Sequence, residues 1–404
     1  MRSFLAAVVL AVTSSAASAQ WTLQNSNTTA SLRGIHSLGD GVAWASGTSG
    51  TVLRTTDGGA TWEKCAVPPK AEKLDFRAVQ GFNAKAAMVM SSGTGQDSRI
   101  YKTNDGCKTW ALIYWNHDAE GFWDAFRLGP DQGSGKDTTE GLLLGDPVKG
   151  HFSLWEVNAD EVNFAVSPVE PRPDSKKQEA AFAASNSSIF IEWTFGTFWI
   201  GTGGKDGARV IRRVVKQSGP FTRYVYPAAK VPMAHGSDSA GIFGLAFRPE
   251  QKVPGKSLKF AVGVAVGGDY QQPNEAAGTA AYTFDAGKTW QAAQTPPNGY
   301  RSAVAYDAAR QAWITVGPSG TDVSTDDGAN WSAVKSADGS DKGWNALSLP
   351  FVVGEKGRIG RLDADALKHA TPNAAAAQTP ASNAKSSKAA SPKKKRKFGI
   401  FLQQ

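Results

Sequence analysis

An eight-residue turn motif occurs four times in this 404-residue chain and constrains its fold more than any other feature. The copies share a Ser or Thr, an Asp two positions later and a final Trp, and they occupy residues 55–62, 103–110, 283–290 and 324–331. Three copies carry Gly at the fifth position, where the second copy has Cys107. A motif that returns along a chain indicates a repeat architecture, in which each copy marks one structural unit.

Motifs of the form Ser/Thr-x-Asp-x-Gly-x-Thr-Trp are called Asp-boxes. A short carboxylate can accept backbone N–H groups inside a tight turn, and the Gly supplies the positive φ that such a turn needs. The Trp then buries a large ring beneath the turn. We therefore interpret the Asp and Trp residues of the motif as structural and not as catalytic, namely Asp57, Trp62, Asp105, Trp110, Asp285, Trp290, Asp326 and Trp331.

Short apolar runs separated by Gly-rich turns precede each Asp-box Trp, which is a strand pattern. In the first unit the predicted strands form a four-stranded antiparallel meander at 34–37, 42–46, 52–55 and 61–67. The same order of elements recurs near 75–115, 123–168, 179–227, 239–297 and 300–335, although the third and fourth units lack a recognisable Asp-box.

A final unit begins at Trp344 and supplies only three strands, ending near Leu362. The segment Trp21 to Gln24 resembles the Trp-led strand that closes the other units. We predict an all-β, seven-bladed β-propeller of four-stranded antiparallel blades, closed by the N-terminal strand joining the last blade. Ring closure is favoured because an open solenoid would need capping units. Most of the thirteen Trp residues are predicted to pack between blades.

Both ends of the chain differ in composition from its centre. Residues 1–19 combine Arg2, an apolar run and small residues before Gln20, which predicts a secretory signal peptide that is too short to anchor the mature protein. We therefore expect a soluble monomer, exported to the periplasm or the extracellular space. The propeller is predicted at 20–364, followed by a disordered basic tail rich in Ala, Ser, Pro and Lys at 365–404.

The formal net charge of +8 is located in the tail. From Lys368 onward there are seven Lys, one Arg and no acidic residue, so the remainder of the chain is neutral. The body therefore lacks the basic footprint of a nucleic-acid-binding protein, and we predict no nucleic-acid partner. The tail is predicted to contact an anionic envelope surface.

The only cysteines, Cys65 and Cys107, belong to neighbouring units of an exported chain, where disulfides persist. A bridge between these units and a pair of unpaired thiols are both open at this stage. The five His residues are scattered without a ligand pattern, so neither a metal site nor a cofactor is predicted.

Several stretches carry a resemblance to a known family, namely 47–62, 145–148, 267–290 and 316–331. In these stretches the chain resembles the Asp-box (BNR-repeat) propellers and, among them, a bacterial exported branch of the relatives of the photosystem II stability and assembly factor. The resemblance covers roughly residues 20–364. It implies a seven-bladed propeller in an extracytoplasmic space that acts as an assembly or binding factor without catalysis. The photosynthetic role is not carried over, because nothing in the sequence indicates a pigment or photosystem partner.

Charged and polar residues recur at one face of the predicted ring. The start of each innermost strand and the loop between the second and third strands lie opposite the Asp-boxes, and we name this side the channel face. The residues predicted there are Arg33, Arg77, Asp124, Asp146, Glu179, Asp269, Tyr270, Arg301, Asn345 and Glu355. Such residues predict a polar funnel that binds an extracytoplasmic protein or peptide, with a glycan as the alternative ligand. In the competing interpretation the charges pair with one another around a water-filled channel.

A glycosidase is the alternative from a different functional class. Sialidases place three arginines, a carboxylate pair and a Tyr nucleophile on an Asp-box propeller, and this chain offers Arg33, Arg77, Arg301, Asp124, Glu179 and Tyr270 for those roles. The Phe-Arg-Ile-Pro signature of that family is replaced here by the sequence Leu-Arg-Gly-Ile at 32–35. A non-catalytic binding protein is therefore the preferred hypothesis.

Overall fold

The computed structural model describes residues 21–129, 140–192, 196–218, 221–249, 261–334, 341–363, 367 and 371–372. The predicted signal peptide at 1–19 and the predicted tail at 365–404, apart from residues 367 and 371–372, lie outside these ranges. Within the described ranges, no helix combines the length and the apolar character of a membrane span.

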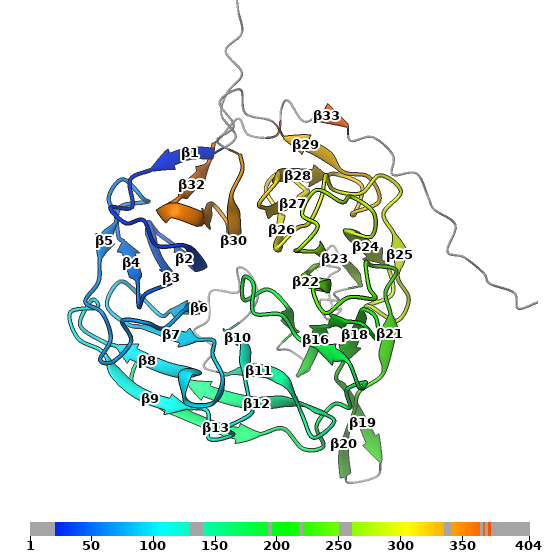
Figure 1. The fold of residues 1–404 in the computed structure, drawn as a ribbon, viewed down its shortest axis with the longest axis horizontal. Coiled ribbons are helices and arrows are strands. Elements are labelled where there is room, and N and C mark those ends of the chain that lie inside the picture. The colour runs from blue at the N-terminus through cyan, green and yellow to red at the C-terminus, as the bar shows by residue number, and fades with distance from the viewer. Residues whose placement is uncertain are drawn as a thin grey trace, which may run out of the picture.

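Seven antiparallel sheets stand around a central axis as the blades of a propeller, which confirms the predicted fold class (Figure 1). We number the blades in chain order. Blade 1 contains β2 (Leu32–Gly39), β3 (Val42–Gly47), β4 (Val52–Thr55) and β5 (Glu63–Lys64). Blade 2 contains β6 (Phe76–Gly81), β7 (Ala87–Ser91), β8 (Arg99–Thr103) and β9 (Ala111–Trp115). Blade 3 contains β10 (Trp123–Leu128), β11 (Glu140–Val148), β12 (His151–Ala159) and β13 (Phe164–Pro168).

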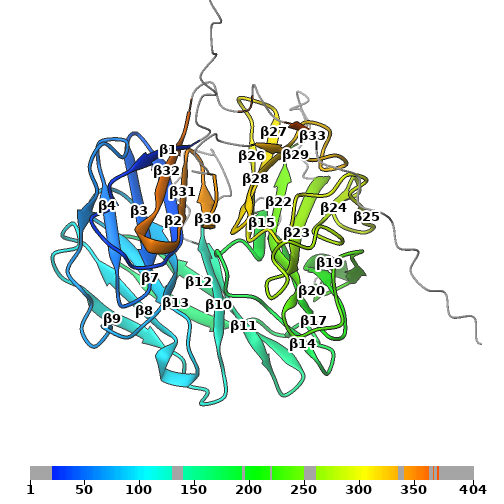
Figure 2. The same cartoon turned by 45° about the horizontal axis from the view of Figure 1, so that its top comes forward.

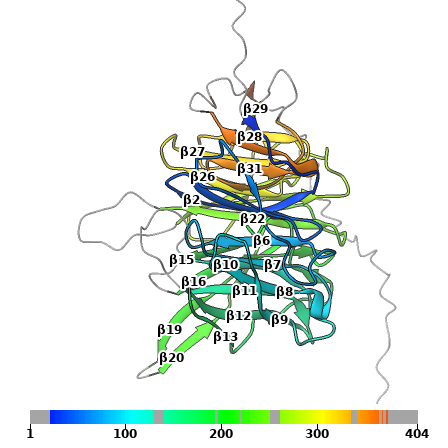
Figure 3. The ribbon, with the colours of Figure 1, turned by 90° about the vertical axis from the view of Figure 1, so that its left-hand side faces the viewer.

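Blades 4 and 5 depart from the simple meander. Blade 4 contains β15 (Ile189–Glu192), β16 (Thr197–Gly201), β18 (Arg209–Arg212) and β21 (Ala228–Lys230). A hairpin of β19 (Val214–Ser218) and β20 (Phe221–Val225) is inserted before β21 and extends away from the ring (Figure 3). Blade 5 contains β22 (Ala240–Arg248), β23 (Val262–Asp269), β24 (Ala280–Thr283) and β25 (Gln291–Ala292), and its sheet also takes in β14 (Glu179–Ala180) and β17 (Gly203–Gly204). The predicted fourth unit at 179–227 begins too early, because β14 belongs to the sheet of blade 5. It also ends too early, because the last strand of blade 4 is β21, which extends to Lys230.

The last two blades complete the ring. Blade 6 contains β26 (Ala303–Asp307), β27 (Ala312–Gly317), β28 (Gly320–Ser324) and β29 (Ser332–Val334), with β33 (Thr371–Pro372) added at its outer edge. Blade 7 contains β30 (Trp344–Ser348), β31 (Phe351–Gly354), β32 (Ile359–Leu362) and the N-terminal β1 (Trp21–Gln24). Trp21 pairs with Leu362 and Gln24 with Ile359. The predicted closure by both ends of the propeller is confirmed, and β1 lies beside β32 in Figures 1 and 2.

The apolar core lies between the blades. Trp62 of blade 1 packs edge-on against Phe351 of blade 7, with ring centroids 5.6 Å apart. Trp290 of blade 5 belongs to a cluster that includes Trp199 of blade 4. Trp110 and Trp331 likewise join clusters that span their own blade and the preceding one. Each Asp-box Trp thus fills an interface between two blades, as predicted.

The Asp-box turns have the predicted internal geometry. Asp57 Oδ1 accepts the backbone N–H of Thr61 at 2.9 Å, and its Oδ2 accepts the Thr61 hydroxyl at 2.6 Å. The Thr55 hydroxyl donates to the same carboxylate at 2.8 Å. Gly59 has a φ of 86°, in the left-handed region that Gly adopts without cost. These hydrogen bonds, first those of Thr61, lower the pKa of Asp57 to about 2.

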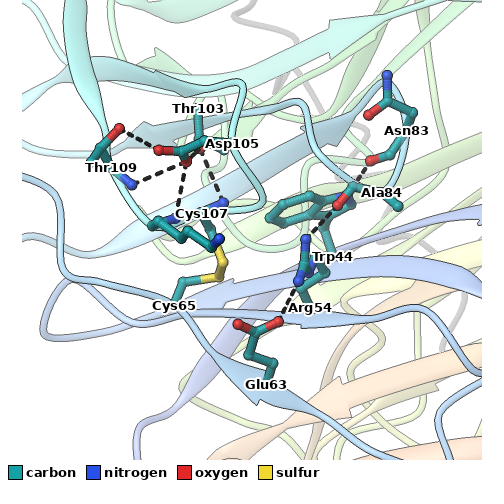
Figure 4. Close-up of a disulfide and its surroundings, with 11 residues drawn as sticks. Trp44, Arg54, Glu63, Cys65, Asn83, Ala84, Thr103, Asp105, Cys107 and Thr109 are labelled. Carbon is teal, nitrogen blue, oxygen red and sulfur yellow. Dashed lines mark hydrogen bonds and ion pairs between the residues drawn. A yellow bond between two sulfur atoms is a disulfide. The ribbon is translucent and has the colours of Figure 1, made fainter.

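Cys65 and Cys107 form a disulfide, which decides between the two alternatives left by the sequence (Figure 4). Cys107 occupies the glycine position of the second Asp-box with a φ of 64°. The bridge joins the outer edge of blade 1 to the Asp-box turn of blade 2. Close by, Arg54 pairs with Glu63 and donates to the Ala84 carbonyl at 2.6 Å, which ties the same two blades together.

Candidate functional site

The inner strands of five blades carry a register shift at their start, on the channel face. A β-bulge leaves one residue outside the hydrogen-bonded ladder and redirects its side chain. The residues at these positions differ from blade to blade and are Arg33, Arg77, Asp124, Phe243 and Asn345. The propeller therefore presents an asymmetric set of side chains from equivalent positions.

Blades 1 and 2 supply two guanidinium groups that share one carboxylate. Arg77 Nε donates to Asp75 Oδ2 at 2.8 Å, and Arg33 Nε lies 3.9 Å from the same oxygen. About a quarter of each arginine side chain is exposed. Burial, and then the charge of Arg77, lowers the pKa of Arg33. We name Arg33, Arg77 and Asp75 the cationic sector, because two guanidinium groups here face the one carboxylate of Asp75. Asp75 was not identified from the sequence.

Blade 3 supplies a pair of carboxyl groups next to the arginines. Asp124 is 2 % exposed, and burial, reinforced by the charge of Asp146, raises its pKa well above the ordinary value. Burial also raises the pKa of Asp146 to about 6, although the Ala181 N–H donates to its Oδ1 at 3.1 Å. Arg77 acts on Asp124 in the opposite direction, so the acidic and cationic groups are neighbours.

An aromatic wall from blades 4 to 6 lies on the same face. Phe243 stacks on Phe182 with centroids 4.0 Å apart and meets the edge of Tyr300 at 4.8 Å. Tyr270 contacts Phe243 edge-on at 6.1 Å and is 50 % exposed. Sequence reasoning found Tyr270 but missed the other three, because it searched for charged residues. Gly267 pairs with Ile242 of the inner strand, and Phe243 follows Ile242 at the bulge. Aligning Gly267 with the glycines that end the second strands of the other blades would have identified Phe243.

Arg301 was predicted on the channel face at the start of an innermost strand, but it does not occupy the position equivalent to Arg33 and Arg77. In blade 1 a side chain at Gly47 would collide with Leu32, and in blade 6 a side chain at Gly317 would collide with Arg301. Arg301 is therefore equivalent to Leu32, one residue before the bulge, and the bulge position falls on Ser302. An offset of one residue turns a side chain to the other face of a strand.

The consequence for Arg301 is complete burial. It is 1 % exposed, forms an ion pair with the fully buried Asp322 and donates to Ser319 Oγ at 2.7 Å. Arg301 thus stabilises blade 6 from within and contributes no free guanidinium to the channel face. The arginine triad required by the sialidase-like alternative is not assembled.

Glu179 is likewise withdrawn from the channel face. Its side chain is fully buried, and Arg209 Nε donates to it at 2.8 Å, with a further hydrogen bond from the Thr202 hydroxyl. Glu179 lies in β14, whereas the inner strand of blade 4 is β15, which begins only at Ile189. Glu179 therefore holds neighbouring segments together.

The remaining predicted residues have mixed roles. Asn345 Nδ2 donates to the Leu32 carbonyl at 2.9 Å and so ties blade 7 to blade 1. Asp269 accepts the Ser237 hydroxyl at 2.8 Å. Glu355 is exposed at the start of a short 3₁₀ turn (Glu355–Gly357), where its charge acts on Arg33. Of the predicted set, Glu355 and Tyr270 have exposed side chains, and the charge of Glu355 acts on Arg33.

Residues 183–187 cross the centre of the ring, and we name them the channel plug. Arg77 Nη1 of blade 2 donates to the Ala183 carbonyl at 2.6 Å. The Asn186 side chain both donates to and accepts from the backbone of Phe126 in blade 3, each at 2.7 Å. These bonds hold the plug from one side of the channel.

The opposite side is held in the same way. The Ser185 hydroxyl donates to the Ser302 carbonyl of blade 6 at 2.6 Å, and the Leu245 N–H of blade 5 donates to the Ser187 carbonyl at 2.7 Å. The plug thus contacts blades 2, 3, 5 and 6. A continuous water-filled channel, as in the competing interpretation of the sequence, is interrupted at this level.

No group of three or more His, Cys, Asp or Glu side chains suited to a metal ion occurs among the described residues. The channel face instead combines a cationic sector, a carboxyl pair and an aromatic wall. Such a combination can bind carboxylates and aromatic or aliphatic side chains, which are the groups of a polypeptide.

Comparison with known proteins gives a result at the level of fold. No family model matches the chain, and no curated protein matches it in sequence. A solved structure of YCF48 bound to D1 peptide matches with a TM-score of 0.52 and 14% identity, covering 86% of this chain and 98% of that one. YCF48 from Cyanidioschyzon merolae matches with a TM-score of 0.52 and 18% identity, covering 85% and 99%.

The chain has the fold of YCF48. YCF48 is a photosystem II assembly factor. The sequence resemblance to relatives of that factor is therefore confirmed as a similarity of structure. The low identities limit this conclusion to the fold.

Proposed function

We propose that this protein is an exported, non-catalytic binding factor that holds a peptide segment of another extracytoplasmic protein on its channel face. The observation that carries the proposal is the pair Arg33 and Arg77, which share the single carboxylate of Asp75. Two partly exposed guanidinium groups that hydrogen-bond or pair with one carboxylate keep further donors for a carboxylate-bearing partner.

The aromatic wall supports a polypeptide as the ligand. The exposed ring of Tyr270 and the Phe243 cluster beneath it offer apolar contact next to the cationic sector. Interfaces of this kind gain most of their binding energy from aromatic and arginine side chains. YCF48, which shares the fold, has been solved with a D1 peptide bound, and a peptide ligand is therefore compatible with this architecture.

Two features support export. The first 19 residues have the composition of a signal peptide, as described above. The disulfide between Cys65 and Cys107 is of a kind that persists in oxidising compartments. Fractionation of cells that produce the full chain, or a version lacking residues 2–19, tests this part of the proposal. Equal partition of both versions into the cytoplasm would contradict it.

Affinity capture from the extracytoplasmic fraction of the source cells tests binding. The tagged protein and its Arg33→Glu and Arg361→Glu variants would serve as baits. Arg361 is an exposed residue of β32 and provides a matched charge reversal away from the channel face. A polypeptide captured by the wild type and by Arg361→Glu, but lost with Arg33→Glu, is the expected result. Equal capture by all three baits would locate the interaction elsewhere.

A further inference from the structure

The hairpin of β19 and β20 takes the place of an Asp-box turn in blade 4. It connects β18 to β21, the third and fourth strands of the blade, where blades 1, 2, 5 and 6 carry their Asp-boxes. Next to its base, Arg212 Nη1 donates to the Ala286 carbonyl in the Asp-box turn of blade 5 at 3.2 Å. The hairpin therefore leaves the ring from the side opposite the channel face and extends outward (Figure 3).

One face of the hairpin is held by the propeller. The ring of Tyr224 lies over the guanidinium of Arg213, with Cζ 4.8 Å from the ring centroid. Arg213 is 8 % exposed and also forms an ion pair with Glu156 of blade 3. On the same face of the hairpin as Tyr224, Gln217 Nε2 donates to the Thr222 hydroxyl across the strands at 3.1 Å. This face is thus engaged by contacts within the chain.

The other face combines an aromatic ring with two cations, and we name it the outer face of the hairpin. Lys216 lies directly opposite Arg223, and Phe221 is two residues before Arg223, so the three side chains share this face. Phe221 is 73 % exposed, and both cations are exposed as well. The segment 214–225 contains no Asp or Glu. Within the part of the chain that the structure describes, neither cation has an ion-pair partner.

The outer face is unfavourable for the isolated protein. Like charges directly opposite each other on neighbouring strands are destabilising, and a two-stranded hairpin is by itself only marginally stable. Within the described structure this sheet consists of β19 and β20 alone, so no third strand supports the pair of Lys216 and Arg223. A like-charge pair that is kept beside an exposed ring, on a projecting hairpin, indicates a partner that is negatively charged and accepts an aromatic side chain.

An anionic lipid surface has both properties. Aromatic rings gather at the interface between membrane and water, and anionic headgroups attract basic residues that lie near the surface. We propose that the outer face of the hairpin docks on an anionic lipid surface, with the Phe221 ring in the interfacial layer and with Lys216 and Arg223 against the headgroups. The channel face stays open in this arrangement, so the docking is independent of the proposed peptide binding.

Sedimentation with lipid vesicles tests this inference. The chain from Gln20 onward lacks the predicted signal peptide and keeps every described residue and the basic tail. We expect it to sediment with vesicles of equal parts phosphatidylglycerol and phosphatidylcholine, and not with vesicles of phosphatidylcholine alone. Raised salt should weaken this binding, because it screens the charges.

Two hairpin variants locate the contact. Lys216→Glu places opposite charges across the strands, so it should hold the hairpin at least as firmly as the wild type and yet weaken vesicle binding at least about fivefold. Hydrogen–deuterium exchange of β19 and β20 verifies that the hairpin is retained. Phe221→Ser should also weaken vesicle binding several-fold, and the exposure of Phe221 means that the fold does not depend on its ring.

Trp115→Ser and Arg361→Glu are the matched controls, since they change an exposed aromatic residue of blade 2 and an exposed cation of blade 7. Both should bind vesicles as the wild type does. Absence of sedimentation with the anionic vesicles would overturn the proposal and favour an acidic protein as the partner of the hairpin. Equal sedimentation with both kinds of vesicle, unchanged binding by either hairpin variant, or an equal loss in the controls would overturn it as well.

Discussion

Arg77 Nη1 donates a 2.6 Å hydrogen bond to the Ala183 carbonyl and thereby connects blade 2 to a segment of blade 4 that fills the channel. Its Nε meanwhile holds Asp75 at 2.8 Å. One side chain thus links the cationic sector of the channel face to the channel plug. Arg77 is consequently both a candidate binding residue and a support for the centre of the ring.

Arg77→Ala should loosen the plug. A hydrogen bond from a charged group contributes about 1.5–3 kcal/mol, so amide exchange in residues 183–187 should accelerate on that scale. Hydrogen–deuterium exchange with peptide-level readout measures this effect. Arg33→Ala serves as the control, because within the described part of the chain Arg33 forms its ion pair with Asp75 and makes no hydrogen bond or ion pair with the plug, so this variant should leave the exchange of the plug unchanged. Identical protection in Arg77→Ala and wild type would contradict this account of the plug.

Trp290→Ala should destabilise the propeller by about 3–5 kcal/mol, the range for emptying a buried aromatic site. Trp290 is 9 % exposed and fills the interface between blades 4 and 5. Trp115→Ala, at a residue that is 38 % exposed, should cost much less. Chemical denaturation compares the two. Equal losses would mean that the Asp-box Trp has no special role between blades.

Arg301→Ala should lower the free energy of unfolding by about 3–5 kcal/mol, because it removes the guanidinium that forms an ion pair with the buried carboxylate of Asp322. The double variant Arg301→Met, Asp322→Leu should recover much of this loss, since it removes both charges together. Thermal and denaturant unfolding measure both variants. If Arg301→Ala unfolds like the wild type while losing affinity for a partner, the buried structural role assigned to Arg301 is wrong.

Acid should weaken the Asp-box turns. Hydrogen bonds from Thr61 to Asp57, and from Thr109 to Asp105, lower both pKa values to about 2 from an ordinary value of 3.8. A carboxylate with a lowered folded-state pKa stabilises the fold above pH 4, and this contribution is lost as the pH falls toward 2.

The melting temperature measured between pH 5 and pH 2 should therefore fall less steeply for Asp57→Asn than for the wild type. Asp40→Asn is the matched control, because Asp40 is exposed and its left-handed backbone suits Asn. A wild-type slope in Asp57→Asn, equal to that of the control, would show that the turn does not depend on the ionised carboxylate.

The fold was predictable because its signals are local. Each Asp-box identifies a turn and a buried Trp within eight residues, and Trp21 identifies the strand that closes the ring. The fourth unit was placed less well. It has no Asp-box, and β14 and the hairpin β19–β20 are additions that no repeat pattern marks.

The site was only partly predictable. Arg33, Arg77 and Asp124 were identified as charged residues at the start of their innermost strands, and the structure shows that each of these positions is a bulge. Arg301 was misplaced because neighbouring residues in Tyr-Arg-Ser-Ala both fit the pattern, and only the register distinguishes them. Contacts such as that of Ala183 with Arg77 depend on how non-adjacent blades pack, which sequence spacing does not reveal.

The location of the partner tests the central claim most directly. Tyr270 and Phe284 both belong to blade 5 and are 50 % and 52 % exposed, but Tyr270 lies on the channel face and Phe284 in the Asp-box turn on the opposite side. A photoreactive phenylalanine placed at either position would be irradiated in cells that produce the tagged protein. We expect the position of Tyr270 to give a cross-linked polypeptide that the position of Phe284 does not give. Cross-linking from the position of Phe284 alone would contradict binding at the channel face.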